Sequence, residues 1–126
     1  MKSIRLTIHP NPPFRLDFTV WVLRRRPVNR IDLYDGRTYS RAVLIDGAPA
    51  LLEVEQTRAA DVPQLTARIR GDNLAADAGQ SATRILTDML ALDRDISGFY
   101  ALAENDSNLA ALVNPFSGMR PPRFST

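Results

Sequence analysis

Few residues of this chain could do chemistry, and their scarcity excludes most classes of enzyme. The sequence has no cysteine and a single histidine, His9, so thiol nucleophiles, thiolate metal sites and clusters of histidine ligands cannot be assembled. None of its glycines forms a Gly-x-Gly pair, which excludes the common phosphate-binding loops. An isolated histidine at the end of a predicted strand is usually structural or solvated. We therefore expect no catalytic residue, no metal site and no cofactor in this chain.

Two aspartates in the last third of the chain could act as a pair. Asp93 and Asp95 flank Arg94, and two carboxylates at that spacing could share a metal ion or a proton. Aspartate is also favoured at the start of a helix, where it accepts backbone hydrogen bonds and faces the positive end of the helix dipole. No glycine-containing calcium loop surrounds the pair. We expect both aspartates to be structural, one ending a helix and the other capping the next.

Arginine is the residue type here that suits an anionic partner. Of the 16 basic residues only Lys2 is a lysine, and a guanidinium can hold a phosphate through two hydrogen bonds. The run Arg24-Arg25-Arg26, close to Trp21, is the sharpest candidate for DNA contact, and Arg120 and Arg123 are further candidates. A solvated patch is the favoured interpretation of the run, because cations stabilise a helix C-terminus by themselves. Trp21 is expected in the core.

The elements that position these residues fit a single domain, since the 126 residues are 44% hydrophobic and 24% charged. A strand is predicted over residues 4–8. A cluster of prolines follows, and then residues 14–26. Strand remains an alternative for that segment, but the near-helical spacing of Leu16, Val20 and Leu23 favours a helix.

Two Asp-Gly pairs organise the middle of the chain. Each lies between runs rich in Val, Ile, Tyr and Leu, and Asp-Gly is a favoured pair in tight type I′ hairpins. The pairs predict an antiparallel meander with strands over 29–34, 37–45 and 49–57, and alternation over 65–70 adds a fourth strand. Apolar and acidic residues alternate within 49–57, which indicates a sheet with one covered face and one wet face.

Helices are predicted to cover the sheet. An apolar stripe at helical spacing consists of Ala78, Ala82, Ile85, Leu86, Met89 and Leu90. Asp77 could begin this helix with a capping box, and short helices over 96–104 and 107–113 would have Asp95 and Asp106 as N-caps. The fold class is therefore α+β, an antiparallel β-meander backed by helices.

Segments spread over most of the chain resemble the N-terminal domain of the DNA-3-methyladenine glycosylase II family, one of the helix–hairpin–helix DNA glycosylase families. The weaker of these segments are residues 13–17, 21–26, 35–39, 52–54 and 92–95. The most specific are Phe99-Tyr100-Ala101-Leu102-Ala103 and Gly118-Met119-Arg120-Pro121-Pro122-Arg123-Phe124.

The resemblance implies a fold similar to one repeat of the TATA-binding protein. It also implies an α+β domain over 1–114 and a linker over 115–126 toward a helical catalytic domain that this sequence does not contain. In that family the aspartate that assists cleavage of the N-glycosidic bond, and the helix–hairpin–helix that grips DNA, belong to the helical domain. No residue here matches that aspartate, so the chain alone is expected to be inactive.

The expected function is therefore the non-catalytic N-terminal part of an alkylated-base DNA glycosylase in base-excision repair. This part would pack on the helical domain of the same polypeptide and help to shape the cleft that recognises damaged double-stranded DNA. No signal peptide and no membrane-spanning run is evident, so we expect a cytoplasmic protein without a membrane partner.

The rival hypothesis is a freestanding binding module with a fold like the TATA-binding protein, whose open sheet face binds DNA, a small ligand or another protein. The character of that face separates the two hypotheses. Exposed apolar residues there would favour docking, whereas a face studded with arginines would favour nucleic acid.

Overall fold

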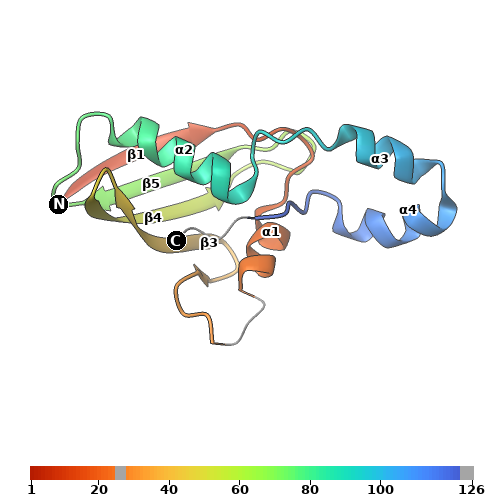
Figure 1. Cartoon of the computed structure of the whole chain (residues 1–126), viewed down its shortest axis with the longest axis horizontal. Coiled ribbons are helices and arrows are strands. Elements are labelled where there is room, and N and C mark those ends of the chain that lie inside the picture. The colour runs from red at the N-terminus through yellow and green to blue at the C-terminus, as the bar shows by residue number, and fades with distance from the viewer. Residues whose placement is uncertain (25–27, 123–126) are drawn as a thin grey trace.

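The computed structural model describes residues 1–24 and 28–122, and its body is a five-stranded antiparallel sheet with helices on one side (Figure 1). The strands are β1 Lys2–Ile8, β2 Leu33–Tyr34, β3 Thr38–Ile45, β4 Ala48–Gln56 and β5 Leu65–Gly71. The helices are α1 Leu16–Leu23, α2 Ala78–Leu90, α3 Ser97–Glu104 and α4 Ser107–Val113, followed by the 3₁₀ turn η1 Asn114–Phe116. The α+β class predicted from the sequence is confirmed.

The order of strands in the sheet is β1-β5-β4-β3-β2. Strands β2 to β5 form the predicted meander, and β1 pairs antiparallel with β5 at the far edge. The first predicted strand of the meander, 29–34, is wrong for most of its length, since only residues 33–34 pair. The side chain of Asn29 instead accepts hydrogen bonds from the backbone of Ile31 and Asp32, and such side-chain bonds replace the ladder of a strand.

The two Asp-Gly pairs form different turns. Asp46 and Gly47 both have positive φ, 51° and 82°, and they join paired residues as a two-residue hairpin, so the type I′ prediction is confirmed there. At Asp35 the prediction is wrong, because the last pair is Tyr34 with Tyr39 and a longer loop separates them. The Asp35 carboxylate accepts two backbone hydrogen bonds in that loop, and these bonds lower the pKa of Asp35.

The segment after the prolines is a helix, as the spacing of its apolar residues predicts. Leu16, Val20 and Leu23 of α1 are buried, but the prediction that Trp21 lies in the core is wrong, because its side chain is 63% exposed. Each helical residue is rotated by about 100° from the one before it. The burial of Val20 therefore turns the next side chain away from the sheet.

Helix α2 lies along the covered face of the sheet. Its buried residues are those of the predicted stripe, with Ile85 half-buried at the margin. The predicted capping box is wrong, because the Asp77 side chain caps no backbone group of the helix. On β4 the apolar residues Leu52 and Val54 are fully buried while their acidic neighbours face the other side, which confirms one covered and one wet face.

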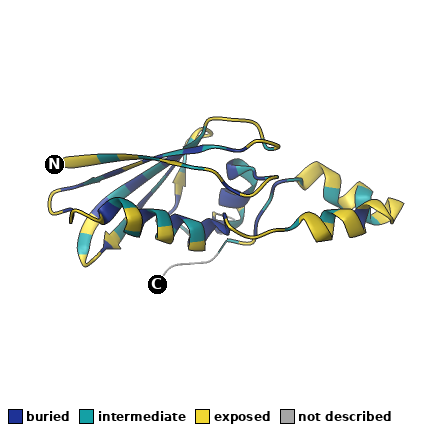
Figure 2. Ribbon diagram, turned by 90° about the horizontal axis from the view of Figure 1, so that it is seen from above, coloured by how far each residue is buried: buried dark blue, intermediate teal, exposed yellow. Residues whose placement is uncertain are grey.

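Helices α3 and α4 form a hairpin that extends from one end of the sheet body (Figures 1 and 2). Asp106 caps α4 as predicted, since its carboxylate accepts from the backbone of Asn108 and Leu109. The prediction of Asp95 as the N-cap of α3 is wrong, because α3 begins at Ser97 and Ile96 occupies the N-cap position. The Asp95 carboxylate still accepts from the backbone N–H of Ser97. Hydrogen bonds from Ser97 lower the pKa of Asp95. The carboxylates of Asp95 and Asp106 thus both bind backbone groups near the helix starts, which is a structural role.

Candidate functional site

An apolar groove of about 370 Å³ lies where α1, the α3–α4 hairpin and the segment after it meet. Its lining residues come from four parts of the chain and are Val22, Phe99, Tyr100, Leu112, Val113, Phe116, Met119, Arg120 and Pro121. Several of these side chains are substantially exposed, including Phe99, Leu112 and Phe116. Contiguous exposed apolar surface of this kind makes the groove a candidate interaction site, unlike apolar residues scattered singly.

The α3–α4 hairpin, which lines part of the groove, carries only acidic charge, whereas Arg120 lines the groove from the segment after the hairpin. Residues 95–119 contain Asp95, Glu104 and Asp106 but no lysine, arginine or histidine. Phosphate binding depends on nearby cations, so this surface is unsuited to DNA. Its composition fits a partner that presents apolar side chains beside basic ones.

The segment that follows α4 packs on the body of the protein. Phe116 contacts Phe18 of α1, with ring centroids 6.0 Å apart. The carbonyl of Gly118 accepts from the backbone N–H of Arg15 at 2.8 Å, and its own N–H donates to the hydroxyl of Tyr100 at 2.9 Å. The boundary between domain and linker at residue 114 stays a prediction, but residues 116–120 are held against the sheet body and the hairpin.

Arg120 is placed in the interior and not at a DNA-facing surface. Its side chain is 1% exposed, and its guanidinium donates to backbone carbonyls, among them those of Ala91 at 3.0 Å and Pro13 at 2.9 Å. Donors directed at carbonyls of the same chain cannot also hold a phosphate. Arg120 as a DNA contact stays a prediction, while its burial and its carbonyl partners favour a structural role.

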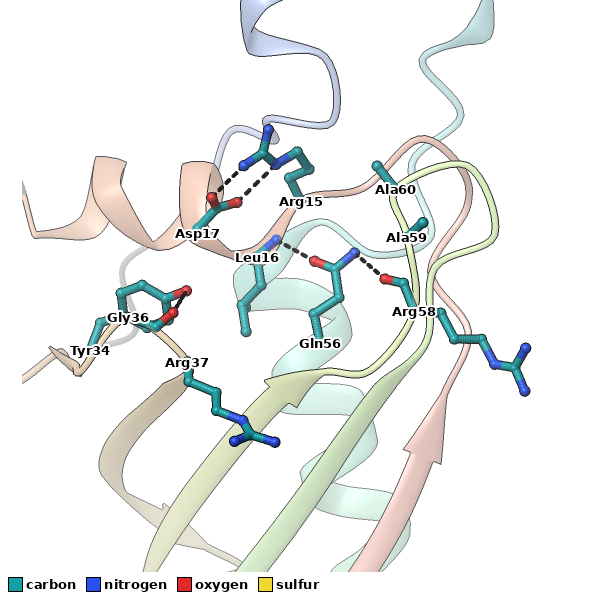
Figure 3. A pocket seen from close by; sticks show the side chains of 10 residues that line it. All are labelled: Arg15, Leu16, Asp17, Tyr34, Gly36, Arg37, Gln56, Arg58, Ala59 and Ala60. Carbon is teal, nitrogen blue, oxygen red and sulfur yellow. Dashed lines mark hydrogen bonds and ion pairs between the residues drawn. The ribbon is translucent and has the colours of Figure 1, made fainter.

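A second cavity, of about 450 Å³, lies at the end of the sheet near the start of α1 (Figure 3). Three arginines contribute to its lining, but each has a partner: Arg15 pairs with Asp17, Arg37 pairs with Glu55, and Arg58 donates to Gln64. In Figure 3 the Arg58 guanidinium points away from the other two. The cavity is therefore not a preformed anion site.

The family of the chain follows from a comparison with known proteins. The model of the AlkA N-terminal domain matches residues 4–125. The chain belongs to the AlkA N-terminal domain family. No curated protein matches it. Among solved structures, the 3-methyladenine DNA glycosylase from Archaeoglobus fulgidus is similar, with a TM-score of 0.66, 20% sequence identity and coverage of 95% of this chain. This AlkA N-terminal domain spans only 39% of that chain.

The remaining DNA-contact candidates of this AlkA N-terminal domain stay predictions. Arg24 is exposed, and its guanidinium donates to the carbonyl of Tyr34 at 3.2 Å. Arg25, Arg26 and Arg123 lie outside the described residues. His9 is exposed, in keeping with a solvated histidine.

The open face of the sheet is neither apolar nor uniformly basic. Arg5, Arg68 and Arg70 project from β1 and β5, and Glu53 and Glu55 lie beside them on β4. Arg70 pairs with Glu53 at 2.7 Å. Because the carboxylates offset these cations, the face supports nucleic-acid binding only weakly.

A metal site and a membrane-spanning helix are both absent from residues 1–24 and 28–122, the part of the chain that the structure describes. Within them, no group of three or more acidic or histidine side chains is placed to hold a metal ion. None of the helices in these ranges has both the length and the apolar character needed to cross a membrane.

The groove is not among the sites predicted from the sequence, although the composition of one segment could have indicated it. Residues 95–119 combine several large apolar residues with a complete absence of basic ones, in a chain whose net charge is +2. Such a segment, predicted as two short helices, is too small to bury its own apolar side chains.

Proposed function

We propose that this AlkA N-terminal domain is the non-catalytic part of an alkylated-base DNA glycosylase that acts in base-excision repair in the cytoplasm. It packs against a helical catalytic domain and helps to shape the cleft that receives the flipped base. The family match supports the class of enzyme. The apolar groove carries the proposal, because the described residues leave its apolar side chains uncovered.

The occupant of the groove in this proposal is the helical domain of the same polypeptide. Pro121 lines the groove, so the last described residues of the chain lie at this surface. A covalently joined partner has a high effective concentration and needs few specific contacts to dock. The acidic charge of the α3–α4 hairpin favours a helical surface with basic residues around its apolar centre.

The chain itself supplies no group for base excision in this proposal. Cleavage of an N-glycosidic bond by water needs an acidic group beside the extruded nucleotide. The carboxylates of Asp95 and Asp106, just before α3 and α4, accept backbone hydrogen bonds near the helix starts. Their role is to fix the hairpin, and contact with damaged double-stranded DNA is chiefly the task of the helical domain.

The first test is the intact mass of the native product. A mass well above that of these 126 residues identifies the longer polypeptide. Excision of 3-methyladenine from alkylated duplex DNA is then compared between that polypeptide, its helical part and this chain alone. We expect release by the longer polypeptide and none by this chain. Release of the base by this chain alone would overturn the non-catalytic role.

The docking surface is tested in trans by calorimetry between this chain and the separately produced helical part. Leu112→Asp places a charge in the groove, and Leu44→Asp places the same charge at a similarly exposed position on β3, outside the groove (71% and 67% exposed). We expect Leu112→Asp to weaken binding by roughly tenfold or more, as for a residue near the centre of an interface. Equal effects of the two substitutions would show that the helical domain docks elsewhere.

The arginine run yields a separate prediction. Replacing Arg24, Arg25 and Arg26 together by Ala in the longer polypeptide is expected to leave excision and DNA affinity largely intact, because the favoured interpretation of the run is a solvated patch. DNA affinity is measured at several salt concentrations. A large loss accompanied by a shallower salt dependence would mean that the run contacts phosphates.

The rival function, a freestanding DNA-binding module, rests on the arginines of the open sheet face. Under that hypothesis this chain alone binds duplex DNA, and the triple replacement of Arg5, Arg68 and Arg70 by Ala abolishes binding. The control for this triple variant is the replacement of Arg24, Arg25 and Arg26 by Ala, which removes the same number of charges elsewhere. Absence of DNA binding by this chain alone rejects the DNA-binding form of the rival.

A further inference from the structure

The α3–α4 hairpin is joined to the sheet body by two chain crossings. The first is residues 91–96, after α2, and the second is residues 117–121, after η1. Helices α3 and α4 pack chiefly on each other and on η1, and they extend beyond the sheet (Figures 1 and 2). The orientation of the hairpin therefore depends on how the two crossings are held.

Arg120 joins both crossings to a third segment. Its Nη1 donates to the carbonyls of Ala91 and Arg94, in the first crossing. Its Nη2 donates to the carbonyls of Asn11 and Pro13, between β1 and α1. Four acceptors from two separate segments thus converge on one guanidinium that belongs to the second crossing.

The surroundings of Arg120 are those of a buried cation without a carboxylate partner. Its side chain is 1% exposed, and no ion pair found among the described residues includes it. Burial lowers the pKa of Arg120 from its ordinary value, but a guanidinium keeps its charge at neutral pH. The carbonyl dipoles replace water around that charge, so moving either segment away leaves buried donors unsatisfied.

The backbone beside Arg120 is fixed as well. Its N–H donates to the Thr19 hydroxyl of α1 at 3.1 Å. Gly118 has φ +97°, and a Cβ at this position would come within 2.8 Å of the backbone nitrogen of Arg15. Asn11 bridges to the first crossing by donating to the carbonyls of Leu92 and Asp93.

We propose that Arg120 is a positioning residue that locks the α3–α4 hairpin, with the apolar groove it carries, in one orientation on the sheet. That the groove receives the helical domain rests on the function proposed above. Arg120 then sets the direction from which that domain approaches the sheet, and through it the geometry of the damage-recognition cleft. Lysine cannot replace it, because an ammonium has three donors on one atom and cannot span four carbonyls on two sides.

The absence of cysteine makes a direct test possible. Ser3→Cys on β1 and Asn108→Cys on α4 introduce spin labels at two exposed positions, and pulsed electron resonance measures the distribution of distances between them. We expect one narrow peak for the protein with Arg120. Arg120→Met and Arg120→Lys are expected to give a broad or two-peaked distribution.

Two control variants separate positioning from general loss of charge or stability. Arg94→Met makes the same chemical change in the first crossing, but at an exposed side chain, and should keep the narrow peak. Leu86→Ala weakens the core away from the crossings and should lower the unfolding temperature while the peak stays narrow.

The measurement needs neither DNA nor a helical domain, so its outcome is independent of the proposed function. A narrow, unshifted peak in Arg120→Lys or Arg120→Met would overturn the proposal. A broad peak in the protein that retains Arg120 would also overturn it, whether or not the variants fold.

Discussion

Replacing Asp32 by Ala is expected to destabilise the protein by about 3–5 kcal/mol, the cost of breaking a buried ion pair from one side. Asp32 is 2% exposed. Its carboxylate pairs with Arg41 at 3.0 Å and accepts from the hydroxyl of Tyr39 and the amide of Asn29. The Tyr39 hydroxyl is a donor at neutral pH, as for any tyrosine, and burial raises its pKa further. Without Asp32, all three donors lose this acceptor in the interior.

Urea unfolding at neutral pH measures the effect of Asp32→Ala. The matched control is Asp61→Ala, at an exposed aspartate in the loop before β5, where we expect a change within about 0.5 kcal/mol. Asp32 also ties the loop after the arginine run to β3 through Tyr39 and Arg41. A loss below about 1 kcal/mol at Asp32 would mean that this network is not a net stabiliser of the fold.

Leu86→Ala is expected to cost about 2–5 kcal/mol, through the lost burial and the cavity left behind. Leu86 lies at the centre of the α2 stripe and is fully buried against the sheet. The comparison is Leu44→Ala, which removes the same atoms from a side chain that is 67% exposed. Calorimetric or urea unfolding of both variants gives the difference. Similar small losses at the two positions would contradict the packing of α2.

Local patterns in the sequence predicted the regular elements well. The spacing of Ala82, Leu86 and Leu90 predicted α2 and its buried face, and Asp106 predicted the start of α4. Gly47 predicted a two-residue hairpin that the structure contains. These features depend on neighbours within about one helical turn or across one tight turn, so the information is contiguous in the sequence. The resemblance carried by residues 99–103 and 118–124 extended this to the family, which the match over 4–125 confirms.

Local patterns failed where distant segments decide the environment of a side chain. The residue type of Trp21 predicts a place in the core, but α1 faces the sheet with Leu16, Val20 and Leu23 and leaves Trp21 exposed. No local pattern in the sequence indicates that Asp32 is buried against Tyr39 and Arg41 of β3. These contacts depend on how the loop before β2 aligns with β3 in the folded protein.

By itself, the sequence determined the α+β class, the positions of most helices and strands, and the family. Only the tertiary structure decided that Arg120 is buried and that the apolar side chains of α3 and α4 form a groove with α1. The physical reason is the span of the contacts. The carbonyls that hold Arg120 lie 26 to 109 residues away in the sequence, and no local periodicity encodes where such segments meet.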